Sequence, residues 1–149
     1  MTTNNPFRLR RVLRAPPDRV YRAFLDPDAM GKWMPPHGFT GKVHEINAVA
    51  GGSYRMSFTN FSTGTRHAFG ETFEELVPDQ RIRYSNRLQD SDLPGETQVT
   101  ITLKAVSVGT ELDIVTQDGG SDEPQDGHYL GWQQSLMQLA QLIEADIPD

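Results

Sequence analysis

The C-terminal part of the chain contains one long amphipathic segment, from about Pro124 to Ile143. Its large apolar residues recur with helical spacing, so that Trp132, Leu136, Leu139 and Ile143 form one stripe. It is the one long helix that the sequence predicts, and it follows a long stretch with the pattern of β-strands. Because such a helix must bury its stripe, we expect it to lie against one curved face of the preceding sheet and to leave an apolar hollow there.

The rest of the chain predicts one strand, two short helices and then six strands. The first strand covers residues 7–14, and the two helices follow at 16–25 and 28–33, with prolines at the start of the first and at the end of the second. The six later strands are expected at residues 39–47, 53–59, 66–75, 81–87, 99–104 and 111–115. Short turns join most of them, and loops are expected at 89–96 and 117–126. The fold class is therefore α+β, with a curved antiparallel sheet of about seven strands around the terminal helix.

Composition narrows the class of protein. The 149 residues suit a single domain over residues 1–149, and the absence of cysteine excludes disulfides and thiolate chemistry. The formal net charge of -6 argues against a nucleic-acid partner. The N-terminus is polar and no apolar run approaches the length of about 18 residues that a membrane span needs. We therefore expect a cytoplasmic protein that does not insert into membranes.

Several short motifs, taken in order, resemble one family. These are Ala15-Pro16, Val20 to Phe24, Lys32 to Pro35, Gly51 to Tyr54, Gly70, Phe73 to Leu76, Pro78, Arg81-Ile82, Gly109 to Leu112 and Gly131-Trp132. The chain is similar to the START-like (SRPBCC) superfamily, and within it to the homologues of the activator of heat-shock protein 90 ATPase. The resemblance implies a helix-grip fold with a cavity under the long helix, and no particular activity. The co-chaperones of the family carry a further N-terminal domain, so a chaperone partner is less expected here than a small molecule.

Strand parity and the family's cavity together indicate which side chains would line a ligand site. They are aromatic, methionine and leucine side chains: Trp33, Tyr54, Met56, Phe58, Phe69, Phe73, Tyr84, Trp132 and Leu136. Such linings give large contact areas and adapt to varied ligands. The alternative is that the same residues are ordinary core. Gly131 is relevant because glycine inside a helix costs about 1 kcal/mol relative to alanine, which close packing or space for a ligand would offset.

Glu71 is the unusual member of this pattern. Strict alternation places its carboxylate between Phe69 and Phe73 on the apolar face, where desolvation would raise its pKa and fit it for acid–base work or for orienting a polar ligand group. In the alternative interpretation, Gly70 forms a bulge that turns Glu71 to solvent. His67 has the same parity, so a His67–Glu71 pair is a further hypothesis.

Other kinds of site are not indicated. The histidines at 37, 44, 67 and 128 lack metal-binding spacing, and the acidic residues between 118 and 126 do not fit a calcium loop. No nucleotide fingerprint or nucleophile elbow occurs. We expect neither metal nor cofactor.

The sequence thus favours a domain that binds an apolar or aromatic small molecule between sheet and helix. Two alternatives remain: an enzyme acting on such a molecule, with Glu71 or His67 as acid–base group, and a co-chaperone-like module for protein interaction. We expect a binding domain rather than an enzyme.

Overall fold

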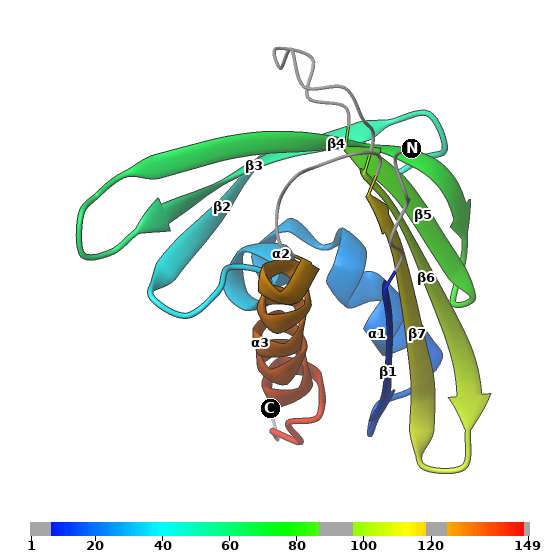
Figure 1. Cartoon of the computed structure of the whole chain (residues 1–149). Coiled ribbons are helices and arrows are strands. Elements are labelled where there is room, and N and C mark those ends of the chain that lie inside the picture. Colours follow the sequence, from blue (N-terminus) through cyan, green and yellow to red (C-terminus); the bar gives the residue numbers. More distant parts are fainter. Residues whose placement is uncertain (1–6, 87–96, 119–124, 148–149) are drawn as a thin grey trace.

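The computed structural model describes residues 7–86, 97–118 and 125–147 (Figure 1). The order of elements is the predicted one, a strand, two short helices, six strands and a long helix. Their bounds are β1 (Phe7–Leu13), α1 (Pro17–Leu25), α2 (Pro27–Trp33), β2 (Phe39–Ile46), β3 (Ser53–Asn60), β4 (Arg66–Val77), β5 (Arg81–Asn86), β6 (Thr97–Val106), β7 (Gly109–Asp118) and α3 (Gln125–Ile143). The expected loop at 89–96 and the expected helix start at Pro124 lie outside the described residues.

All seven strands form one antiparallel sheet, in the order β1-β7-β6-β5-β4-β3-β2. The sheet is strongly curved, and the three helices lie on its inner side (Figure 1). Alternation along each strand sends apolar side chains to this inner face and polar ones outward. The predicted α+β class and helix-grip arrangement are confirmed.

Proline and aspartate residues set the boundaries of α1 and α2. Pro16 precedes α1, and Asp26 both ends α1 and accepts a hydrogen bond from the backbone N–H of Ala29 at 3.0 Å, which caps α2. The Trp33 indole at the end of α2 donates a hydrogen bond of 2.8 Å to the carbonyl oxygen of Ala23 in α1. The two helices therefore form one compact pair beneath the sheet.

The packing of α3 differs from the expectation. We expected its stripe to dock directly on the strands, but its nearest neighbours are α2, α1 and β1. Leu136, Leu139 and Ile143 are buried in one core cluster with the inner residues of β6 and β7. The physical reason is that α1 already lies against β6 and β7, so the long helix packs on the helix pair and the edge strand. Figure 1 shows α3 beneath the arch of the sheet.

Two irregularities in the strands explain where the alternation pattern is weak. The register of β2 against β3 shifts between Val43 and Glu45, and that of β4 against β5 shifts between Phe73 and Glu75. The first shift accounts for the poor pattern of residues 39–47. Neither shift falls at Gly70, which keeps its place opposite Arg55 in an unbroken ladder with β3.

Candidate functional site

The inner faces of β3, β4 and β5 bring most of the sequence-predicted site residues together. Met56 lies opposite Phe69 and Tyr54 opposite Glu71 in the β3–β4 ladder, and Phe73 lies opposite Tyr84 in the β4–β5 ladder. We call this group the inner cluster, and it consists of Tyr54, Met56, Phe58, Phe69, Glu71, Phe73 and Tyr84. The ladders therefore place one carboxylate within a surface of aromatic rings.

Glu71 shares the face of Phe69 and Phe73. The interpretation in which Gly70 forms a bulge and exposes Glu71 is wrong, because the ladder with β3 runs unbroken from Ser53–Thr72 to Thr59–Arg66. Glu71 is half-buried, and its Oε2 accepts a hydrogen bond of 2.5 Å from the Tyr54 hydroxyl.

This environment changes the acid–base properties of three side chains. Burial raises the pKa of Glu71 to about 7, although the hydrogen bond from Tyr54 acts in the opposite direction. Burial, with the nearby Glu71 carboxylate, also raises the pKa of Tyr54 and of Tyr84 well above the ordinary tyrosine value. Both tyrosines therefore stay protonated at neutral pH, whereas Glu71 can be charged or neutral there.

The rings of the inner cluster contact one another in two groups. Tyr54 lies with its ring centroid 5.6 Å from that of Phe73 and 6.3 Å from that of Tyr84. Farther along the strands, Phe58 and Phe69 form an edge-to-face pair with centroids 4.9 Å apart. The first group surrounds the hydrogen bond to Glu71, and the second extends the apolar surface beyond it.

Exposure divides the predicted site residues into two sets. Tyr54, Met56, Phe73 and Tyr84 are buried, as are Trp33 and Leu136, and they belong to the core. The half-buried set consists of Phe58, Phe69, Glu71 and Trp132. The three members on the strands point to the side of the sheet that carries the helices, so their exposure means that the helices do not cover this part of the inner face.

Trp33 and His67 do not join the site as the sequence suggested. Trp33 is 1% exposed and its indole N–H is held by Ala23, so its role is to join α1 and α2. His67 is exposed and lies beside Phe39, with ring centroids 6.4 Å apart. No hydrogen bond joins His67 to Glu71 in the described structure, and its acid–base role stays a prediction.

Polar residues of α3 attach the long helix to the C-terminal end of α2. The Gln138 amide donates hydrogen bonds of 2.7 Å to the carbonyl oxygens of Trp33 and Pro35, and the Ser135 hydroxyl donates one of 2.8 Å to the carbonyl oxygen of Met34. Sequence reasoning missed this attachment. The available signal was that Ser135 and Gln138 lie beside the apolar stripe of the helix.

Gly131 marks open space along α3. A Cβ atom built there would meet no heavy atom of the described residues within 4 Å, apart from its own helix and chain neighbours. Close packing of a strand against this glycine is therefore not the reason for its presence. Of the two explanations offered by the sequence, space beside the helix is the one that agrees with the structure.

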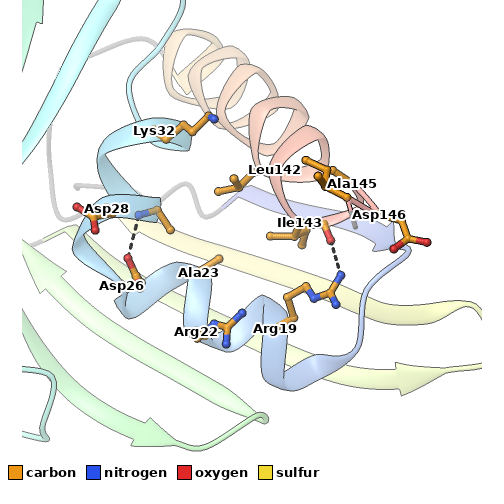
Figure 2. Close-up of a pocket in the computed structure, with 12 residues that line it drawn as sticks. Arg19, Arg22, Ala23, Asp26, Asp28, Lys32, Leu142, Ile143, Ala145 and Asp146 are labelled. Atoms are coloured by element: carbon orange, nitrogen blue, oxygen red, sulfur yellow. Dashed lines mark hydrogen bonds between the residues drawn. The ribbon is translucent and has the colours of Figure 1, made fainter. Parts of the chain in front are cut away.

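A pocket of about 600 Å³ lies elsewhere, between the α1–α2 pair and the C-terminal end of α3 (Figure 2). Arg19 spans it with a hydrogen bond of 3.1 Å to the carbonyl oxygen of Ile143. Its other charged lining residues are of both signs: Arg22, Lys32, Asp26, Asp28 and Asp146. Sequence reasoning did not indicate this pocket, because it forms only where segments distant in sequence meet. Its mixed charges select no particular ligand.

Metal-binding clusters and membrane-spanning helices are both absent from the described residues. Within the described residues, no three histidine, aspartate or glutamate side chains are grouped as a metal ion would require. His44 instead lies on the outer face, where its Nε2 is 2.8 Å from both the Ser57 hydroxyl and the Arg66 guanidinium. No helix in the described ranges is long and apolar enough to cross a bilayer.

Comparison with known proteins identifies the family. The sequence model described as "Activator of Hsp90 ATPase homolog 1-like protein" matches residues 14–144. The chain belongs to this family. Its fold agrees with the START-like superfamily, as the sequence motifs predicted. No curated protein matches the chain.

Solved structures give the same fold. Protein CV1439 from Chromobacterium violaceum is 54% identical, with a TM-score of 0.89, and the match covers 95% of this chain and 99% of that one. Protein NE0264 from Nitrosomonas europaea is 18% identical, with a TM-score of 0.80 and coverage of 93% and 94%. Protein Ms6760 from Mycobacterium smegmatis is also 18% identical, with a TM-score of 0.78 and coverage of 96% and 93%. The latter two show the likeness of fold alone.

Proposed function

We propose that this family member binds an apolar or aromatic small molecule between the inner cluster and α3. The observation that supports this most directly is the partial exposure of Phe58, Phe69 and Glu71 on the face of the sheet that points toward the helices. A face devoted to packing alone would bury its aromatic rings. Exposed aromatic surface inside a fold is the kind of lining that small-molecule sites have.

Binding of an apolar aromatic probe to the full chain tests this proposal. We expect the probe to bind at micromolar concentration and to change the tryptophan fluorescence, because Trp132 is half-buried at the edge of the same core. Phe69→Ala should weaken binding of this probe severalfold. Phe61→Ala is the matched control, because Phe61 is 82% exposed in the turn between β3 and β4. Equal effects of both substitutions, or no probe binding at all, would contradict the proposal.

A second candidate function is catalysis on such a molecule, with Glu71 as the acid–base group. The observation that favours it is the raised pKa of Glu71, about 7, which suits proton transfer near neutral pH. The two functions separate in Glu71→Gln. An enzyme would lose turnover while it keeps apolar-probe binding, whereas a binding domain shows no turnover in either form.

A co-chaperone-like role is the third candidate, favoured by the description of the matching family model. It predicts that the chain binds a chaperone ATPase through its surface. Such binding should be insensitive to Phe69→Ala, which changes the interior. Failure of the full chain to bind or stimulate the ATPase would remove this candidate.

A further inference from the structure

The charge of Glu71 has no partner of opposite sign near it among the described residues. Its hydrogen-bond partner is the neutral Tyr54 hydroxyl, and no salt bridge within the described ranges includes it. Residues 131–143 of α3, whose side chains the structure describes, contain no ionisable side chain. Arg11 has the inward parity on β1, but it is exposed and four strands away in the sheet order.

A buried or half-buried carboxylate without a counter-charge is costly. Removal from water penalises the charged form, and an opposite charge close by is what normally compensates for it. A neutral apolar ligand that covered Glu71 would increase this penalty, and an anionic ligand would add repulsion. A positively charged ligand group would instead supply the missing partner.

The aromatic rings beside Glu71 favour the same kind of ligand. Phe69 lies two residues before Glu71 on the same face, and its ring packs with Phe58 at 4.9 Å between centroids. Both rings are half-buried and therefore available for contact. The faces of aromatic rings attract cations, and a carboxylate combined with such rings is a chemistry suited to ammonium groups.

We infer that the ligand of this site is an organic cation, a protonated amine whose ammonium group pairs with the Glu71 carboxylate and whose apolar body lies along Phe58 and Phe69. The inference rests on the proposed function, because it takes the same space between the inner cluster and α3 as the binding site. It adds the chemical class of the ligand and names Glu71 as the residue that selects it.

Three probes with one carbon skeleton test the inference on the full chain: phenylbutylamine, phenylbutanol and phenylbutyrate, which are a cation, a neutral molecule and an anion. We expect the amine to bind roughly tenfold or more tightly than the alcohol at about pH 8, and the anion to bind most weakly. Isothermal titration calorimetry measures the three affinities directly. The alcohol reports on the apolar site alone.

Glu71→Gln keeps the size and polarity of the side chain and removes its charge. In this variant the amine and the alcohol should bind equally, while the affinity for the alcohol is kept or increased. Glu45→Gln is the matched control, since Glu45 is exposed on β2 opposite Arg55 and its loss changes the net charge equally. It should leave the preference for the amine intact, which separates a local pairing from attraction to a net charge of -6.

The pH dependence gives an independent readout. The groups that face Glu71 from neighbouring strands are Tyr54 and Tyr84, whose pKa values are raised, so they do not titrate near neutrality. Below the Glu71 pKa of about 7, the affinity for the amine should fall, by at most about tenfold per pH unit, until it equals the affinity for the alcohol, which should stay constant. Because His67 shares this face, the same dependence should persist in His67→Gln.

The outcomes distinguish the two proposals. If all three probes bind with similar affinity and Glu71→Gln changes nothing, the site binds apolar molecules but the inference of a cation is wrong. If the anion binds best, the inference is also wrong. If none of the probes binds, the proposed function itself fails.

Discussion

The Tyr54 hydroxyl donates a hydrogen bond of 2.5 Å to Oε2 of Glu71 across the ladder between β3 and β4. Burial raises the pKa of the Glu71 carboxylate, and the neutral Tyr54 hydroxyl stabilises its charged form. The bond thus limits the pKa shift of Glu71 while leaving the carboxylate ionisable near neutral pH.

Removal of this donor should move the Glu71 pKa further upward. In Tyr54→Phe the ring remains and the hydroxyl is lost, so the charged carboxylate loses a hydrogen bond while its burial is unchanged. NMR titration of the Glu71 side chain should therefore give a midpoint above about 7. Tyr21→Phe removes a hydroxyl from a half-buried tyrosine on α1 and should leave the midpoint unchanged. An unchanged or lower midpoint in Tyr54→Phe would mean that the hydrogen bond is unimportant.

The stability of the fold should depend on pH through Glu71. The pKa of this group rises from 4.5 to about 7 on folding, so the folded state holds the proton more tightly. The stabilisation is complete below the unfolded pKa and is lost as the pH rises through the folded one. Its size is at most about 3 kcal/mol, because each pKa unit corresponds to about 1.4 kcal/mol and the group is half-buried.

Denaturant unfolding at a series of pH values measures this effect. Between about pH 5 and pH 8 the wild type should lose stability relative to Glu71→Gln, which cannot titrate at this position. Other groups affect both proteins alike and cancel in the difference. A constant difference over this range would contradict the raised pKa.

The docking of α3 should depend on Leu139, which is fully buried in the core cluster. Leu139→Ala should lower the free energy of unfolding by about 2–5 kcal/mol, the range for buried leucines. Met137→Ala is the control on the same helix, because Met137 is 47% exposed, and it should cost far less. Similar costs at both positions would mean that α3 does not pack as described.

The attachment of α3 to the end of α2 should depend on Gln138. Its amide donates two hydrogen bonds of 2.7 Å, to the carbonyl oxygens of Trp33 and Pro35. Gln138→Ala should therefore cost about 1–3 kcal/mol, since each hydrogen bond contributes about 0.5–1.5 kcal/mol. Gln141→Ala, at an exposed position of the same helix, should be nearly neutral. Thermal and denaturant unfolding of both variants checks the difference.

Two glycine substitutions should have opposite effects on stability. Gly131→Ala adds a methyl group that meets no heavy atom within 4 Å in the described part of the chain outside its own helix, so the better helix propensity of alanine should stabilise the protein by about 0.5–1 kcal/mol. In Gly41→Ala the new Cβ would lie 2.4 Å from Cγ of Pro35 and 3.0 Å from the carbonyl oxygen of Gly31. Overlap with backbone and a rigid ring should destabilise the contact of β2 with α2 by about 1–3 kcal/mol. Unfolding measurements on both variants test the space described at each glycine.

Local sequence patterns were sufficient to predict the elements and most of their faces. Strict alternation placed Phe69, Glu71 and Phe73 on one face of β4, which was one of two interpretations that the sequence left open, and the unbroken ladder with β3 agrees with it. A bulge at Gly70 would have reversed the faces of the residues that follow it, and the sequence could not exclude such a bulge. The bulge lies farther along, between Phe73 and Glu75.

The packing of the helices needed the tertiary structure. The sequence required α3 to bury an apolar stripe. Whether its nearest neighbour is the sheet or the helix pair depends on where α1 lies against the sheet. The hydrogen bonds of Gln138, and that of Arg19 in the pocket, likewise join segments that lie more than one hundred residues apart in the sequence. No local pattern encodes such distances.

Phe69 and Phe73 show most clearly what the sequence determined and what the tertiary structure decided. They are the same residue type on the same strand, which the sequence by itself determined, and the strand ladders place them on the same face. Phe73 is 1% exposed, whereas Phe69 is half-buried. Only the tertiary structure decided this difference, because the burial of a strand residue depends on what packs against it: Phe73 lies within the core cluster and Phe69 lies at its edge.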